Sequence, residues 1–205
     1  MKNIDEQRLE SDLQYRYQYV AEFIRFESED IAAIHAVAAK LLPLVSGMVE
    51  ETYERLLSYD ATRRHFVPRQ HGYEGPLPAD TESLTQNTEQ IQFRKEHLRR
   101  YLMNLFGNSY DTRMVNYLDV VGKMHTPKAG NDRIDVPLVQ MNTLMAFLSD
   151  TLLRTILELD LEREQETRTV LAISKLLWIQ NDLITRHYEE QRPASEPSEP
   201  VPSAG

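Results

Sequence analysis

Apolar residues recur along most of the chain at intervals of three or four residues, which is the spacing of one face of an α-helix. No convincing alternation of apolar and polar positions, the pattern of a half-buried strand, interrupts this spacing. The stripes predict about seven helices, over residues 5–24, 28–40, 42–59, 81–106, 112–126, 136–159 and 162–188. The pattern therefore predicts an all-α fold with these helices packed in one domain.

Local signals explain where these helices begin and end. Ser28 precedes two acidic residues and is a typical helix cap. Pro43 predicts a bend or break between the second and third helices, and the segment 67–80, with three prolines and two glycines, predicts a loop. Gly107 is a good residue to follow a helix, and Pro127 disfavours helical geometry at the residue before it. These boundaries agree with the hydrophobic pattern.

The two ends of the chain differ in character. The N-terminus is charged throughout and lacks the apolar segment of a signal peptide, and no purely apolar run approaches the ~20 residues that span a bilayer. We therefore expect a cytoplasmic protein without a membrane partner. From about Arg192 the sequence RPASEPSEPVPSAG cannot bury enough apolar area to become ordered. The predicted organisation is a domain over 5–190 and a disordered Pro/Ser/Glu tail over 191–205.

Composition narrows the possible chemistry. The 205 residues include no cysteine and only seven glycines, and 23 Lys+Arg against 32 Asp+Glu give a formal net charge of −9. The lack of cysteine excludes disulfide scaffolds, thiolate zinc sites and iron–sulfur clusters. The acidic balance argues against nucleic acid as a partner, and no glycine-rich phosphate-binding motif is present.

One of the six histidines has a distinctive setting. None of the six pairs with another at the HxxxH or HExxH spacing of zinc hydrolases. His125 lies in the final turn of the predicted helix 112–126, directly before Thr126 and Pro127. There one ring nitrogen can face a pocket while the other donates to a backbone carbonyl, which is how an imidazole metal ligand is normally oriented. The alternative on local features alone is a capping or core histidine.

Two segments resemble the globin domain of globin-coupled sensors and protoglobins. The segment YVAEFIRFESEDIAAIHAVAAKLLPLVSGMVEETYERLLSYDATRRHF, residues 19–66, is similar to the start of that domain, with a helix B tyrosine at Tyr53. The segment HLRRYLMNLFGNSYDTRMVNYLDVVGKMHTPKAG, residues 97–130, is similar to helix E, the EF turn and helix F with its proximal histidine. The spacing Gly122-x-x-His125 also matches the family pattern.

The resemblance implies a globin-like fold over about residues 5–190, a three-over-three helical sandwich with an extra N-terminal helix. The helices 136–159 and 162–188 would take the positions of helices G and H. In the family these two helices also form a dimer interface, so the resemblance implies a homodimer through the last two helices. The alternative is a monomer in which the apolar stripes are fully internal.

The same resemblance implies a haem b cofactor whose iron is bound by His125. Tyr53 would donate a hydrogen bond to O₂ on the distal side, whereas CO, which draws little charge, would gain much less. The alternative is that Tyr53 is an ordinary core tyrosine. The implied cofactor-binding residues are His125, Tyr53, Leu98 over the distal face, Phe66 at the haem edge, Arg94, Tyr101, Met124 and Leu144. Any apolar helix face would supply similar wall residues.

Other charged residues and histidines carry simpler interpretations. The pattern places Arg94, Lys95 and Lys123 on a solvated face, with a haem propionate as an alternative partner for one of them. His97 is next to Leu98, and because neighbours on a helix differ by about 100° in direction, His97 should point away if Leu98 points inward. The remaining histidines, His35, His65, His71 and His187, are interpreted as surface or loop residues.

Three functions follow from this resemblance. The first is a gas-binding protein for O₂, CO or NO, acting as an O₂ sensor with a separate signalling partner or as a stand-alone protoglobin. The second is a haem-free globin fold that serves as an interaction module in stress signalling, which the presence of both His125 and Tyr53 argues against. The third is a haem enzyme acting on NO, nitrite or peroxide, but no distal acid–base pair is evident, so we expect no enzyme.

Overall fold

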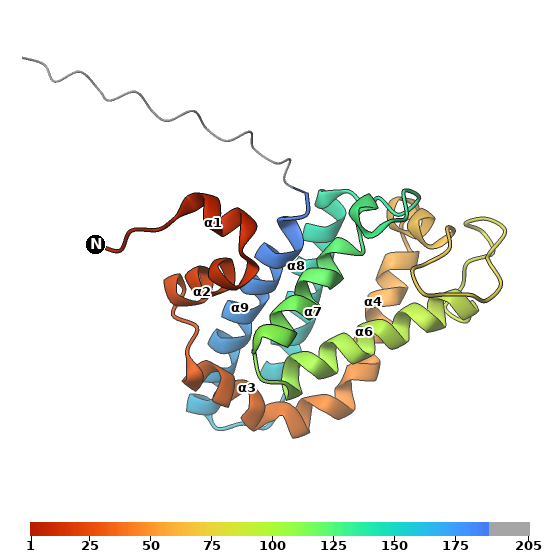
Figure 1. Ribbon diagram of the computed structural model, residues 1–205. Helices are drawn as coiled ribbons and strands as arrows, with labels where there is room; N and C mark the ends of the chain where they lie inside the picture. The colour runs from red at the N-terminus through yellow and green to blue at the C-terminus, as the bar shows by residue number, and fades with distance from the viewer. Residues whose placement is uncertain (189–205) are drawn as a thin grey trace, which may run out of the picture.

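The computed structural model describes residues 1–188, and all regular structure within this range is helical (Figure 1). The α-helices are α1 (Glu6–Ser11), α2 (Leu13–Phe23), α3 (Ser28–Leu41), α4 (Val45–Leu57), α5 (Asp60–Arg63), α6 (Glu89–Gly107), α7 (Thr112–Lys123), α8 (Leu138–Leu157) and α9 (Arg163–Thr185). Short 3₁₀ helices are η1 (Leu42–Leu44), η2 (Arg64–Phe66) and η3 (Pro127–Ala129). The predicted all-α class is confirmed, and the predicted tail lies outside the described residues.

The N-terminal segment forms two helices, α1 and α2, where the sequence predicted one. Asp12, between them, has an extended backbone, with φ −115° and ψ 100°. Its carboxylate accepts hydrogen bonds from the backbone N–H groups of Gln14 and Tyr15 at 3.1 and 3.0 Å. An aspartate in this position stabilises the start of a new helix. The apolar spacing that predicted one helix over residues 5–24 therefore runs across two helices.

The long helix predicted from residue 81 begins only at Glu89. Polar side chains in the preceding segment bond to their own backbone: the N–H of Ser83 donates to Asp80 at 2.8 Å, and the N–H of Thr85 donates to the Thr88 hydroxyl at 2.9 Å. Such local bonds compete with the helix. Leu84 is fully buried although it lies in a turn. A buried leucine in this segment is therefore not a sign of a helix.

Pro43 bends the chain without breaking it, because it lies at the start of η1 and the flanking residues keep helical geometry.

By length and composition alone, the stretch Ser28–Leu57 could cross a membrane. Its two α-helices, α3 and α4, pack against α9 and α6 in the fold. The end of α7 behaves as the sequence predicted, since Thr126, before Pro127, is extended.

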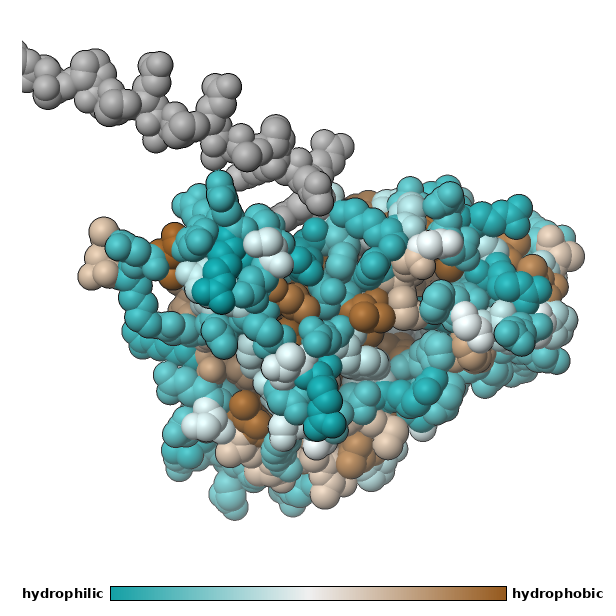
Figure 2. Space-filling model, viewed as in Figure 1, coloured by the Kyte–Doolittle hydropathy of each residue, from teal (hydrophilic) through white to brown (hydrophobic). Residues whose placement is uncertain are grey.

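Helix α9 is the centre of the packing, with α3, α7 and α8 against it, while α6 packs on α3 and α4. Figure 1 shows α7 crossing in front of α8, with α6 running below it towards α4. The face turned to the viewer is mostly hydrophilic, and its hydrophobic side chains lie in separate spots rather than in one broad patch (Figure 2). On this face of the molecule, the helices therefore expose no broad apolar surface.

Ion pairs attach the N-terminal helices to α9. The Arg16 guanidinium, which is buried, donates to both carboxylate oxygens of Asp182 at 2.8 and 2.7 Å and so joins α2 to α9. The Lys175 ammonium donates to the Asp30 carboxylate at 2.8 Å and joins α9 to α3. A bidentate arginine–carboxylate pair fixes orientation as well as distance, so α2 is an integral part of the fold.

Helices α7 and α9 approach each other closely at Gly122. A β-carbon built on Gly122 would lie 2.7 Å from the Cα of Ile184 and 3.1 Å from the Cδ2 of His187. Nearby, the Asp119 carboxylate accepts hydrogen bonds from Arg186 at 2.6 Å and from His187 at 2.9 Å. His187 is therefore a largely buried helix-linking residue, which corrects its interpretation as a surface residue.

Asp119 is held in its ionised form by these partners. Burial alone raises the pKa of its carboxyl, but the hydrogen bonds from His187 and Arg186 outweigh that effect and leave the pKa below its usual value. The link between α7 and α9 is thus intact at neutral pH and weakens only as the pH falls through that lowered value.

We predict that Gly122→Ala destabilises the protein by about 1–3 kcal/mol, because the new methyl group would overlap backbone atoms of α9. Gly47→Ala is the matched control, since a β-carbon at Gly47 in α4 meets nothing within 4 Å. A glycine-to-alanine change in such a helix interior stabilises by about 0.5–1 kcal/mol. Urea unfolding of both variants measures the difference, and equal effects of the same sign would contradict the close approach.

Candidate functional site

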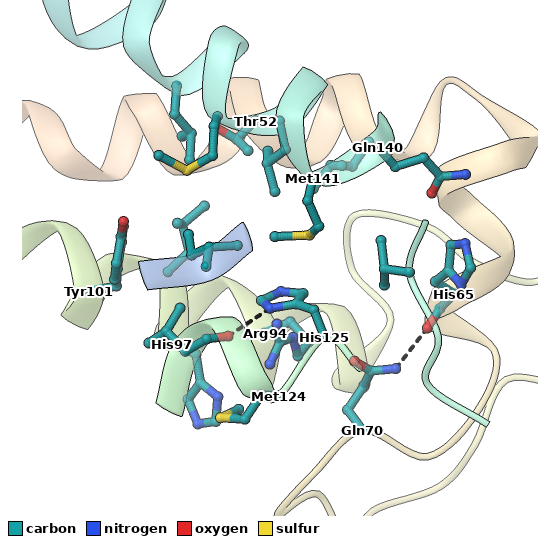
Figure 3. Close-up of a pocket in the computed structure, with 18 of the residues that line it drawn as sticks. Thr52, His65, Gln70, Arg94, His97, Tyr101, Met124, His125, Gln140 and Met141 are labelled. Atoms are coloured by element: carbon teal, nitrogen blue, oxygen red, sulfur yellow. Dashed lines mark hydrogen bonds between the residues drawn. The ribbon is translucent and has the colours of Figure 1, made fainter. Parts of the chain in front are cut away.

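A cavity of about 360 Å³ lies between α4, α6, α7 and α8, with one residue of α9 also at its wall (Figure 3). A single water molecule needs only about 10–15 Å³ on a comparable measure, and ligand sites typically measure ~300–1,000 Å³. All eight cofactor-binding residues that the sequence suggested line this cavity: His125, Tyr53, Leu98, Phe66, Arg94, Tyr101, Met124 and Leu144. The fold thus brings together positions that are up to 91 residues apart (144 − 53).

His125 lies just past the end of α7, and its ring is oriented by one hydrogen bond. Nδ1 is 2.8 Å from the backbone carbonyl oxygen of Val121. Because a carbonyl can only accept, Nδ1 carries the proton and donates, which leaves a lone pair on Nε2. Figure 3 shows the ring in the middle of the cavity lining. The main chain is also fixed, since the N–H of Val136 donates to the His125 carbonyl at 3.0 Å.

The imidazole of His125 is neutral at physiological pH. Burial lowers its pKa to about 4, and the nearby positive charge of Arg94 acts in the same direction, against the hydrogen bond to Val121. A neutral imidazole with one nitrogen held by a carbonyl is the form in which histidine binds a metal ion. The other nitrogen is free to act as a ligand.

Tyr53 lies on α4 with only 3% of its surface exposed. Its ring packs against Phe66 with the centroids 5.7 Å apart and the planes tilted by 52°. Burial raises the pKa of the phenol, although the Arg94 guanidinium beside it opposes this shift. Tyr53 therefore keeps its proton and can donate a hydrogen bond at the cavity wall.

The remaining wall residues differ in what they offer. Leu98, Met124 and Leu144 are half-buried and supply apolar surface from α6, from the end of α7 and from α8. Tyr101 is buried, and its hydroxyl donates to the side-chain oxygen of Gln180 on α9. The Tyr101 hydroxyl is thus already hydrogen-bonded to the protein, and Tyr101 contributes its aromatic ring to the cavity wall.

Two of the basic residues are not on a solvated face, contrary to the sequence interpretation. Arg94 is half-buried and lines the cavity. Lys95 is almost completely buried, and its ammonium donates to the Glu50 carboxylate at 2.6 Å. The acidic partner on α4 allows Lys95 to be buried, which periodicity on α6 alone could not reveal. Lys123 is exposed, as predicted.

Comparisons with known proteins decide the family. The sequence profile of the Protoglobin family matches residues 13–193. The chain belongs to the Protoglobin family. Its fold is similar to the globin domain of a Geobacter sulfurreducens globin-coupled sensor, with a TM-score of 0.67 and 20% sequence identity over 84% of this chain and 97% of that domain. No curated protein matches the chain.

Two histidines of this protoglobin lie at the cavity although the sequence pattern placed them elsewhere. His97 lines it, with its ring 4.3 Å from that of Phe93, and burial lowers its pKa to about 4. His65, in η2, also lines the cavity and is half-buried, which corrects its interpretation as a surface or loop residue. The signal that could have found His65 is its position directly before Phe66, which the family resemblance placed at the haem edge. His35 and His71 are exposed, as predicted.

Within residues 1–188, no three histidine, aspartate or glutamate side chains come close enough to hold a metal ion. The cavity combines one oriented imidazole with a large, mainly apolar lining.

Proposed function

We propose that this protoglobin binds haem b in the cavity, with His125 as the axial ligand, and reversibly binds O₂, CO or NO as a gas sensor. The observation that carries the proposal is the orientation of His125, whose Nδ1 is engaged by Val121 while Nε2 is left with a lone pair at the cavity. The family membership supports the proposal, and the Gly122-x-x-His125 spacing resembles the family pattern around the proximal histidine.

The residues present fit such a cofactor. Haem, when bound, supplies an iron atom with a coordination position open to a diatomic gas. His125 contributes one strong, neutral ligand, and the apolar walls from Leu98, Met124 and Leu144 accommodate a flat hydrophobic ring and exclude water. The Tyr53 hydroxyl offers a hydrogen bond to a gas ligand that carries partial negative charge, so it favours O₂ over CO.

We also propose that the protein forms a homodimer through α8 and α9. Large apolar side chains on these two helices are exposed in the single chain: Val139, Leu157, Leu171 and Trp178. Trp178 is 66% exposed, which is unusual for tryptophan unless a partner covers it. A change at the cavity could then reach a separate signalling partner through the paired helices.

We predict that His125→Ala abolishes stable haem binding, because the imidazole that Val121 orients at the cavity is removed. The absorbance spectrum of the purified protein, before and after addition of haem, measures the loss of the Soret band. His97→Ala is the matched control, since His97 also lines the cavity, and it should keep the band. A wild-type protein that stays colourless with added haem would instead support the haem-free interaction module.

Tyr53→Phe is expected to raise the O₂ dissociation rate about 10- to 100-fold, the effect of losing one hydrogen bond to a charged acceptor. The CO dissociation rate should change little. Tyr101→Phe serves as the control, because the Tyr101 hydroxyl already donates to Gln180. Stopped-flow measurement of both gases tests the idea, and an unchanged O₂ rate would remove Tyr53 from this role.

For the dimer, sedimentation velocity of the wild type should show a species of twice the 23.9 kDa chain mass. Trp178→Glu should shift the population to monomer, because it places a charge in the apolar interface, and should leave the fold intact because the residue is exposed. A wild-type protein that remains monomeric at high concentration would contradict the proposed interface.

A further inference from the structure

The side of α6 that faces the cavity carries a charged residue. Arg94, Leu98 and Tyr101 follow one another at intervals of four and three residues, and all three line the cavity. This spacing places them on one face of the helix. The guanidinium of Arg94 is half-buried there and loses part of its hydration, so a polar partner inside the protein is needed to stabilise it.

The partner of Arg94 is the phenol of Tyr53 on α4. The guanidinium is hydrogen-bonded to the Tyr53 hydroxyl, and its positive charge lowers the pKa of the phenol in the same direction as the hydrogen bond. Among residues 1–188, no aspartate or glutamate forms an ion pair with Arg94, and its Nε is buried without a partner. No carboxylate of the described chain therefore competes with Tyr53 for this guanidinium.

An ion pair between α6 and α4 fixes the two helices next to this contact. Lys95, the neighbour of Arg94 in the chain, is almost completely buried and donates to the Glu50 carboxylate at 2.6 Å. Glu50 lies one helical turn before Tyr53 on α4. The position of α6 along α4 is thus set within one turn of the contact between Arg94 and Tyr53.

A second link holds the other side of the Tyr53 ring. Gln90, one helical turn before Arg94 on α6, donates from its side chain to the Phe66 carbonyl at 2.7 Å. The Phe66 ring packs against the Tyr53 ring with the centroids 5.7 Å apart. The phenol ring is therefore held from both sides by groups that are anchored to α6.

The hydrogen bond from Arg94 determines what the Tyr53 hydroxyl can do. A guanidinium has donors and no acceptor, so the Tyr53 oxygen accepts from Arg94 and its own proton stays available for another acceptor. The phenol keeps that proton because burial raises its pKa above the ordinary value. A hydrogen bond accepted by the oxygen polarises the O–H group, which makes the phenol a stronger donor.

We propose that Arg94 is a positioning residue for Tyr53, which fixes the phenol oxygen so that its O–H group is a directed and polarised donor to a gas ligand in the cavity. The inference rests on the proposed function and adds a second residue to the discrimination between O₂ and CO. A ligand that gathers negative charge gains from a stronger donor, whereas a ligand that draws little charge does not. Arg94 acts through Tyr53 and makes no contact of its own with the gas.

The first test is a double-mutant cycle on the haem-loaded full chain, with the dissociation rates of O₂ and CO as the readout. Arg94→Met removes the charge and the donors but keeps a long side chain. We expect it to raise the O₂ dissociation rate about 3- to 10-fold, the effect of weakening one hydrogen bond, and to leave the CO rate unchanged. When Tyr53→Phe is already present, adding Arg94→Met should change neither rate.

Two further variants make this cycle specific. Arg94→Lys keeps a charged donor and should restore most of the wild-type O₂ rate, and it also serves if Arg94→Met fails to fold. Arg99→Met is the matched control on α6, because Arg99 pairs with Glu96 and does not line the cavity. It should give wild-type rates for both gases.

The second test needs no haem, so it separates this inference from the proposed function. Urea unfolding of the haem-free full chain is measured for wild type, Arg94→Met, Tyr53→Phe and the double variant. Because both single variants break the same hydrogen bond, the double variant should lose less stability than the sum of the two single losses. Arg99→Met combined with Tyr53→Phe is the control pair, and its losses should add.

Other outcomes would overturn the positioning role. If Arg94→Met still raised the O₂ rate when Tyr53→Phe is present, Arg94 would act on the gas directly. Equal changes in the O₂ and CO rates would show an effect of packing alone, and additive losses in urea would show that Arg94 and Tyr53 are not coupled. A wild type that binds no haem would overturn the proposed function, and the urea cycle would then decide the Arg94–Tyr53 pair by itself.

Discussion

The contact between the backbones of α7 and α9 at Gly122 determines where the rest of the site lies. Because Gly122 has no side chain, α7 packs directly against the backbone of Ile184. The hydrogen bonds from Arg186 and His187 to Asp119 fix the position of α7 along α9. His125 comes three residues later, and its ring is oriented by a carbonyl of the same helix. The imidazole is thus held at one place in the cavity wall by packing that begins outside the cavity.

Much of this arrangement could be predicted from the sequence, and the failures have physical reasons. Helical periodicity found the main helices, and the family resemblance placed His125 and Tyr53 at one site. Periodicity identifies which residues share a face, but it does not say what that face packs against. Lys95 is buried because Glu50 on another helix accepts its charge, and no feature near Lys95 in the sequence indicates this. The predicted helices over 5–24 and from residue 81 were too long. The Asp12 side chain caps a new helix, and the Thr88 hydroxyl holds a turn before Glu89, although the apolar spacing continues through both places.

The cavity combines two demands that conflict in an ordinary protein core. A large apolar space loses packing contacts, and a buried polar atom without a partner, such as the Nε of Arg94, loses hydration. The surrounding helices tolerate both because they are joined elsewhere, by Arg16 to Asp182 and by Lys175 to Asp30. Stability and ligand recognition are therefore carried by different parts of the same helices.

The close fit at Gly122 also leaves α7 and α9 little freedom to move independently of each other. Backbone in direct contact with backbone has no flexible side chain that could absorb a displacement, so a pull on the His125 main chain cannot be dissipated at this point. The same segment touches His187, just beyond the last turn of α9. A sub-ångström shift at the imidazole would thus be transmitted to the carboxyl end of α9 rather than lost in the core.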